Sequence, residues 1–255
     1  MIKITIISFI IYSFMYGQDI NPREIMERSY TLKKPMTSIM EIRVEIMRKK
    51  GRKEKVKIRE FTRYEKIYNS GKYRSKTVAR FTKPKIVKGT GLLSWVERSG
   101  ATQQWVFLPK LKSAKKIKAK EKSKSFLNTD FIYEDLENRN PVLDSLAYIG
   151  TDFIDGGQCT VIMAWPKSSS NYFSRKIWTN NSTYQVCKIE FYKNESVLEK
   201  TLILSDFVEI NGFTTPGRMV MRKENGNKTE MKINSFKPDI GLKDEIFSQS
   251  FLIKI

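Results

Sequence analysis

Apolar and polar residues alternate with a period of two over most of the sequence, and this pattern restricts the fold more than any other feature. In the first clear run, Met40, Ile42, Val44 and Ile46 alternate with Glu41, Arg43 and Glu45. Such alternation is typical of antiparallel strands with one buried face. Comparable runs lie near 56–64, 73–81, 91–96, 103–108, 113–119, 148–154, 158–165, 175–179, 184–192, 198–208, 215–222 and 230–236.

Strong turn signals separate these runs. They include Gly156-Gly157, Asn180-Asn181, Asn211-Gly212 and Asn225-Gly226, which are dipeptides that favour tight hairpins. Many short strands at fairly even spacing predict a β-sandwich or β-barrel. Neither a linker nor an internal repeat divides the sequence, so we expect a single domain over 18–255.

Helices are expected at three places. Asn21 can cap a helix over roughly 22–33, because Pro22 suits the first helical position and Pro35 follows its end. A second helix is predicted between Asp130 and Leu146, broken at Pro141. A third, short helix is expected to start at Asp244.

The first residues resemble a secretory signal peptide. Lys3 is followed by an apolar run up to Tyr16, which is short for a bilayer span. Residues 1–17 are therefore predicted to be removed on export, with a retained N-terminal anchor as the alternative. The net charge of +20 favours an acidic partner, and for an exported protein we expect a lipid or membrane rather than nucleic acid.

Two predicted strands are apolar on both faces. In the run 159–165, Val161, Met163 and Trp165 alternate with Ile162 and Ala164, and residues 104–108 behave in the same way. Such strands need cover on both sides. Helices can cover one face, and the other then faces either a second sheet or a cavity.

A lysine-rich passage follows the second of these strands. Eight lysines lie between Lys110 and Lys124, with Glu121 as the only acidic residue. The passage is interpreted either as a solvated hairpin with Ile117 turned inward, or as a surface that attracts anionic lipid. The candidate basic surface comprises Lys112, Lys115, Lys116, Lys118 and Lys120.

The sequence contains few combinations of residues that are typical of catalytic sites. It has no histidine, which excludes Ser-His-Asp and Cys-His mechanisms. Asp130, Glu134 and Asp135 could act as paired carboxylates, but we expect them to pair with the preceding lysines or to start a helix. Ser94 and Ser125 have no evident base. No enzyme activity, cofactor or metal is therefore predicted.

Two smaller features have structural interpretations. The run from Lys88 to Gly91 lacks a complete phosphate-binding motif and is interpreted as a turn in which the backbone passes close to another segment. Cys159 and Cys187 are the only cysteines. They can form a disulfide in an oxidising compartment or remain buried thiols.

Large aromatic and aliphatic residues gather on either side of the lysine-rich passage. They are interpreted as core residues or, alternatively, as the wall of a lipid-binding cavity. The candidate lipid-binding residues are Phe81, Leu93, Trp95, Trp105, Phe107, Phe126, Phe131 and Tyr133.

Three motifs in this region resemble the outer-membrane lipoprotein-sorting proteins of the LolA/LolB-like superfamily. They comprise Arg80, Phe81, Pro84, Lys88, Gly89, Thr90, Gly91, Leu93 and Trp95; then Gln104, Trp105, Leu108 and Pro109; then Ser125, Phe126, Asp130, Phe131, Tyr133, Glu134, Asp135 and Leu136. The resemblance covers a little under a quarter of the sequence in these motifs. The lysine-rich passage departs from the family pattern.

The resemblance implies a mainly β fold, an incomplete and strongly curved antiparallel β-barrel closed by helices. It also implies a periplasmic carrier that shields the acyl chains of lipoproteins or lipids in a hydrophobic cavity during transport toward the outer membrane. The partners implied are lipoprotein acyl chains or lipid, and either an inner-membrane RND/MMPL-type exporter or a lipoprotein-release complex. An accessory adaptor that docks on such an exporter through its basic face is the alternative.

Overall fold

One antiparallel sheet of thirteen strands forms the body of the protein in the computed structural model, which describes residues 20–254. The strands are β1 (Thr37–Lys50), β2 (Lys53–Ile67), β3 (Tyr73–Lys83), β4 (Gly91–Glu97), β5 (Thr102–Leu108), β6 (Ser113–Lys116), β7 (Asp144–Ile154), β8 (Gly157–Pro166), β9 (Ser174–Asn180), β10 (Val186–Tyr192), β11 (Leu198–Ile210), β12 (Phe213–Lys223) and β13 (Lys228–Pro238). The predicted runs of alternating residues are thus confirmed as strands, although β6 ends before the expected Ala119.

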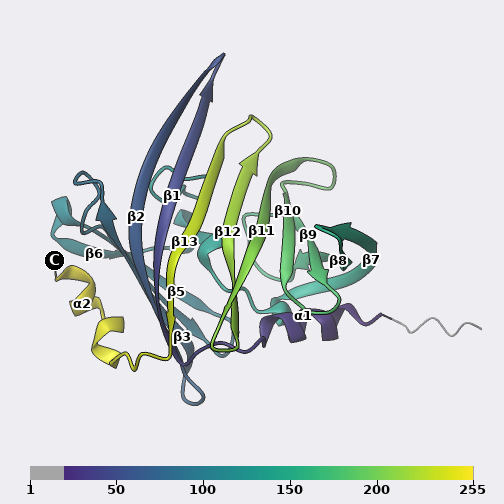
Figure 1. The fold of residues 1–255 in the computed structure, drawn as a ribbon, viewed down its shortest axis with the longest axis horizontal. Coiled ribbons are helices and arrows are strands. Elements are labelled where there is room, and N and C mark those ends of the chain that lie inside the picture. Colours follow the sequence, from purple (N-terminus) through teal and green to yellow (C-terminus); the bar gives the residue numbers. More distant parts are fainter. Residues whose placement is uncertain (1–19, 255) are drawn as a thin grey trace, which may run out of the picture.

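The order across the sheet is β6-β5-β4-β3-β2-β1-β13-β12-β11-β10-β9-β8-β7. From β1 the chain moves outward to the edge at β6, crosses to the opposite edge at β7, and returns strand by strand until β13 pairs with β1. The sheet is strongly curved and does not close (Figure 1). This confirms the incomplete, curved antiparallel architecture that the resemblance implied.

The N-terminal helix α1 (Pro22–Tyr30) begins as predicted. Asn21 Oδ1 accepts hydrogen bonds from the backbone N–H groups of Arg23 and Glu24 at 3.0 and 3.4 Å. The helix ends at Tyr30, three residues earlier than expected. It packs against β7 and β9, and Figure 1 shows it beneath this half of the sheet.

The predicted helix between Asp130 and Leu146 is wrong. This region contains two short 3₁₀ turns, η3 (Tyr133–Leu136) and η4 (Pro141–Leu143), and β7 begins at Asp144. Tertiary contacts prevent a continuous helix because the acidic side chains bind distant groups, such as Asp135 with Lys200 and Asp144 with Arg175. The region is therefore a loop fixed by its side chains.

The C-terminal elements cover the outer face of the sheet. They are η5 (Asp244–Phe247) and α2 (Gln249–Ile253), and the expected helical turn at Asp244 is confirmed. Phe247 and Leu252 are buried against Val78, Leu93 and Phe107. The apolar outer face of β5 is thus covered by helices, as anticipated for a strand that is apolar on both sides.

Gly91 is needed where α2 approaches β4. A Cβ atom at this position would lie 2.7 Å from Leu252 Cδ1, which is too close for a normal contact. Gly89 has a φ of 83° in the preceding turn, a conformation that glycine adopts readily. The structure therefore supports the interpretation of residues 88–91 as a turn with a close backbone approach.

The signal peptide predicted at 1–17 lies outside the described residues. Within residues 20–254, no helix is long and apolar enough to cross a membrane.

Candidate functional site

The concave face of the sheet encloses a cavity of about 550 Å³, here called the apolar cavity. Strands from both halves of the sheet line it, and α1 contributes Met26 and Tyr30 at one end. Representative apolar wall residues are Ile42, Phe61, Leu92, Leu202, Met231 and Ile233. The volume lies within the roughly 300–1,000 Å³ of small-molecule binding sites.

The wall follows directly from strand alternation. On β4, Leu92, Ser94 and Val96 line the apolar cavity, whereas Leu93 and Trp95 point to the outer face. Ala79 pairs with Leu92 across β3 and β4 and lines the cavity beside it. Each strand therefore contributes alternate residues to the two sides of the sheet.

A cap segment, residues 125–136, lies over the concave face. Phe126 and Phe131 point from it into the apolar cavity. The ring of Phe126 also packs against Phe81, with 5.8 Å between centroids, and Phe81 packs against Phe61 at 5.1 Å. The motif residues of the cap segment thus join the cavity wall to the core.

Buried polar contacts hold the cap segment in place. Asp130 Oδ2 binds Arg48 Nη1 at 2.8 Å and accepts a hydrogen bond from Thr229 at 2.6 Å. Asp135 binds Lys200 and accepts a hydrogen bond of 2.6 Å from the hydroxyl of Tyr172. Burial and the adjacent Asp135 raise the pKa of Tyr172, so its hydroxyl remains a donor.

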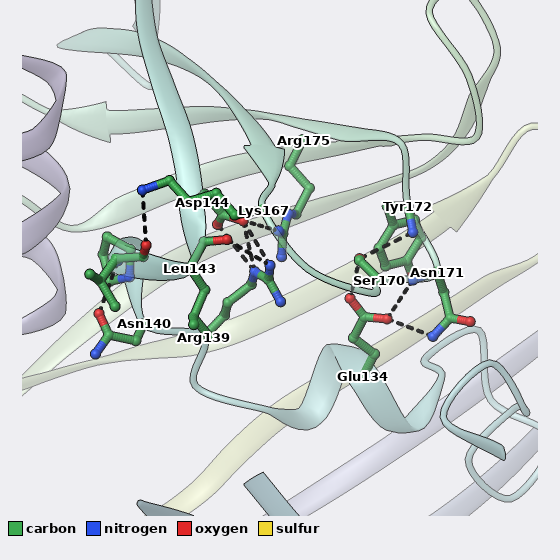
Figure 2. Close-up of polar contacts among 12 residues, drawn as sticks. Glu134, Arg139, Asn140, Leu143, Asp144, Lys167, Ser170, Asn171, Tyr172 and Arg175 are labelled. Carbon is green, nitrogen blue, oxygen red and sulfur yellow. Dashed lines mark hydrogen bonds and ion pairs between the residues drawn. The ribbon is translucent and has the colours of Figure 1, made fainter. Parts of the chain in front are cut away.

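Glu134, the remaining acidic residue of the cap segment, forms hydrogen bonds with the loop between β8 and β9. It accepts hydrogen bonds from the hydroxyl of Ser170 at 2.5 Å and the backbone N–H of Asn171 at 2.8 Å (Figure 2). Burial by itself would raise the pKa of Glu134, but these hydrogen bonds outweigh it and hold the pKa below its usual value. Asp130, Glu134 and Asp135 therefore bind residues from distant strands and loops, so the predicted pairing with the preceding lysines is wrong. The alternative, a helix start, holds only for the short 3₁₀ turn η3, whose first turn contains Glu134 and Asp135.

The eight candidate lipid-binding residues divide between the two faces. Phe126 and Phe131 line the apolar cavity. Phe81 and Tyr133 are buried in the same hydrophobic cluster as Phe126 and Phe131, but they do not line the apolar cavity. Leu93, Trp95, Trp105 and Phe107 lie on the outer face under η5 and α2.

Most of the wall of the apolar cavity lies outside the residues predicted from the sequence. Leu202, Met219, Met231 and Ile233 line the apolar cavity from β11, β12 and β13, far from the family motifs. Met231 and Ile233 alternate with the polar Lys232, whereas Leu202 and Met219 are followed by the apolar Ile203 and Val220. Neither pattern shows which face of the sheet is concave. Only the folded sheet identifies that face, because its concave side carries these residues.

The lysine-rich passage is exposed, and its charge is partly compensated. Lys112, Lys115, Lys116, Lys118 and Lys120 are all exposed, while Ile117 is buried as expected. Glu121 binds Lys115 at 2.7 Å and Lys124 at 3.2 Å. The Lys115 ammonium is the main cause that lowers the pKa of Glu121 to about 2.

A second basic surface, the β1–β2 tip (residues 48–57), lies at the end of the longest hairpin. It contains seven lysines and arginines and one acidic residue, Glu54. Val56 and Ile58 are 46% and 44% exposed beside it, and the hairpin extends beyond the neighbouring strands (Figure 1).

The remaining candidates have structural positions. Cys159 and Cys187 are free, buried thiols in one cluster with Trp178, and burial raises the pKa of Cys187 to about 11. The Ser125 hydroxyl donates to the Thr129 carbonyl at 2.6 Å. Among residues 20–254, no group of three or more His, Cys, Asp or Glu residues could hold a metal ion.

Comparisons with known proteins agree with this architecture. A protein-family model with the description "Uncharacterized protein" matches residues 73–254, and no curated protein sequence matches the chain. The structure resembles a putative outer membrane lipoprotein-sorting protein domain from Vibrio parahaemolyticus with a TM-score of 0.83, at 23% identity over 91% of this chain and 98% of that one.

Two further solved structures share the fold. A DUF1329 family protein from Desulfovibrio piger ATCC 29098 has a TM-score of 0.83 at 25% identity, covering 91% of this chain and 97% of that one. A LolA superfamily protein from Nitrosomonas europaea has a TM-score of 0.68 at 19% identity, covering 91% and 99%. The chain belongs to the family whose model spans residues 73–254, and its fold is LolA-like.

Proposed function

We propose that the protein is a periplasmic carrier that holds the acyl chains of lipids or lipoproteins in the apolar cavity during transport toward the outer membrane. The observation that carries this proposal is a cavity of about 550 Å³ with apolar walls from both halves of an open sheet. Transfer of an acyl chain from water is favourable by about 0.8 kcal/mol per buried CH₂. In this proposal, residues 1–17 direct export and residues 18–255 form the single carrier domain, without catalysis.

A cavity-filling substitution tests the proposal. Ala79 lines the apolar cavity on β3, so Ala79→Trp should occupy part of its volume. Glu41 is exposed on β1 and lies outside the cavity lining, so Glu41→Trp is the matched control. The wild-type protein should bind a fluorescent fatty acid saturably, Ala79→Trp at least tenfold more weakly, and Glu41→Trp like the wild type.

Two aromatic substitutions should separate the faces in the same assay. Phe131→Ala removes a ring from the wall of the apolar cavity and should weaken binding of the fatty acid. Trp95→Leu removes a ring from the outer face and should leave binding unchanged. Absence of saturable binding by the wild-type protein, together with no lipid in its organic extract, would disprove the carrier function.

The adaptor function remains a second candidate because of the basic surfaces. In this case the protein would dock on an RND/MMPL-type exporter through the exposed lysines of the passage 110–124. Replacement of Lys115, Lys116 and Lys118 by glutamate should then abolish association with the exporter. A carrier with this replacement would keep its capacity for fatty acid.

A further inference from the structure

A second cavity of about 390 Å³ adjoins the first and is here called the polar cavity. Its walls come from the β4–β5 turn (99–102), the segment 119–143 and the β8–β9 loop (168–171). Glu134, Glu137 and Arg139 line both cavities. A molecule that extends past these three side chains would therefore contact an apolar and a polar environment.

Five of the residues that line the polar cavity carry hydroxyl groups. They belong to Ser99, Thr102, Ser168, Ser169 and Ser170, and Asn171 adds an amide. Within residues 20–254, the hydroxyls of Thr102, Ser168 and Ser169 make no hydrogen bond to the protein. Each can therefore donate to or accept from a ligand.

The charged groups around the polar cavity already compensate one another. Lys122 binds Glu137 at 2.6 Å, and Arg139 binds Asp144 through its Nε and Nη2 atoms (Figure 2). Arg175 also binds Asp144, at 3.0 Å. The cationic side chains that line the polar cavity are Lys122 and Arg139, the anionic ones are Glu134 and Glu137, and both cations are already paired with a carboxylate, so neither is free to bind a phosphate.

Part of this wall is held rigidly. Glu134 receives hydrogen bonds from Ser170 and from both nitrogens of Asn171 (Figure 2). The next residue, Tyr172, binds Asp135 in the cap segment. The loop 168–171 is thus fixed before a ligand arrives, which lowers the entropic cost of binding.

We propose that the polar cavity binds the uncharged, hydroxyl-rich head group of an amphiphile whose acyl chains occupy the apolar cavity. The proposal rests on the carrier function and specifies its cargo. A sugar or polyol matches the unpaired hydroxyls and the balanced charges. An anionic phosphate head group would have to displace Glu137 from Lys122 or Asp144 from Arg139.

Lipids with identical chains and different head groups test the proposal. Monoglycosyl diacylglycerol, phosphatidylglycerol and diacylglycerol would each displace the fluorescent fatty acid from the wild-type protein. We expect monoglycosyl diacylglycerol to bind at least tenfold more tightly than the other two. In Ser169→Trp, which fills the polar cavity, this preference should disappear while the affinity for diacylglycerol is retained.

Ser182→Trp is the control for Ser169→Trp. Ser182 is an exposed loop serine outside both cavities, so Ser182→Trp should keep the wild-type preference. Equal affinities for the three lipids, a preference that survives in Ser169→Trp, or strongest binding of phosphatidylglycerol would each overturn the head-group proposal alone. If none of the lipids displaces the probe, the carrier function fails as well.

Discussion

Lys200 and Asp135 form a fully buried ion pair, with 2.5 Å between Nζ and Oδ2 and side chains that are 0% and 1% exposed. Lys200 lies on β11 and Asp135 in the cap segment. The ammonium also donates to the backbone carbonyl of Asp130 at 3.1 Å. The pair therefore joins the cap segment to the middle of the sheet.

Removal of one partner of this pair should destabilise the protein strongly. Lys200→Met leaves the Asp135 carboxylate buried without its cation, and such losses cost about 3–5 kcal/mol. The free energy of unfolding from urea titration measures the effect. The double variant Lys200→Met/Asp135→Leu should recover part of the loss, because no buried charge remains unpaired.

The exposed pair of Arg28 and Glu24 on α1 provides the control. Its side chains are 54% and 56% exposed, so Arg28→Met should cost less than about 1 kcal/mol. A Lys200→Met variant as stable as Arg28→Met would show that the buried pair does not hold the cap segment.

Gly91 and Leu252 should be energetically coupled. Gly91→Ala places a methyl group against Leu252 Cδ1, and overpacking of this kind costs about 1–3 kcal/mol. Leu252→Ala removes the obstructing side chain. The cost of Gly91→Ala should therefore fall below about 1 kcal/mol in the Leu252→Ala background. Additive costs in this double-mutant cycle would contradict the close contact between β4 and α2.

Acid should weaken the protein partly through Glu230. Hydrogen bonding to Arg218 is the main cause that lowers the pKa of Glu230 from 4.5 to about 2. Because the folded-state pKa is the lower one, the stabilisation is fully present above about pH 4.5 and is lost as the pH falls toward 2. The difference in unfolding free energy between wild type and Glu230→Gln should therefore be larger at pH 6 than at pH 3.

Glu209→Gln is the control for Glu230→Gln. Glu209 is exposed and has no ion pair among residues 20–254, so Glu209→Gln should follow the wild-type pH profile. If the unfolding free energy of Glu230→Gln depended on pH in the same way as that of the wild type, Glu230 would not contribute to the loss of stability in acid.

The β1–β2 tip should contribute more to the binding of anionic membranes than the lysine-rich passage does. Lys53, Lys55 and Lys57 are exposed and, within the described residues, have no ion pair. Each cation close to an anionic surface contributes about 1 kcal/mol. Reversal of all three to glutamate should therefore weaken binding to phosphatidylglycerol vesicles at least tenfold.

Reversal of Lys115, Lys116 and Lys118 is the matched comparison. Lys115 is paired with Glu121 and Lys116 lies over the ring of Trp105, with 5.4 Å between Nζ and the ring centroid. This variant should lose less affinity in vesicle co-sedimentation at equal ionic strength. Equal losses in the two triple variants would show that only the total charge matters.

Local sequence patterns predicted the strands and the helix start well. Alternation around Ile42 and the cap at Asn21 depend on neighbouring residues, and both are present as expected. The region between Asp130 and Leu146 was mispredicted because its conformation depends on partners such as Lys200 and Arg175, which lie 31 to 65 residues farther along the chain.

The candidate site was only partly predictable for a related reason. Alternation shows that Leu92 and Leu93 lie on opposite faces, but it does not identify the face that becomes the cavity. This depends on α2, whose Leu252 covers the side of Leu93. The aromatic residues of the motifs were therefore recognised as buried. Trp95 and Trp105, which were interpreted as core residues or as candidates for the cavity wall, belong to the core on the other face.

Within residues 20–254 the sheet has two unpaired edges, and we expect them to let its curvature change. β6 and β7 are the edge strands of the sheet. A small change of twist between neighbouring strands would therefore widen or narrow the concave side without breaking the hydrogen bonds between strands. Under the proposed carrier function, the same wall could enclose short and long acyl chains, and the spacing between the edges would vary with their length. Spin labels at Ser113 and Ser145, which are exposed near these edges, would measure that spacing directly.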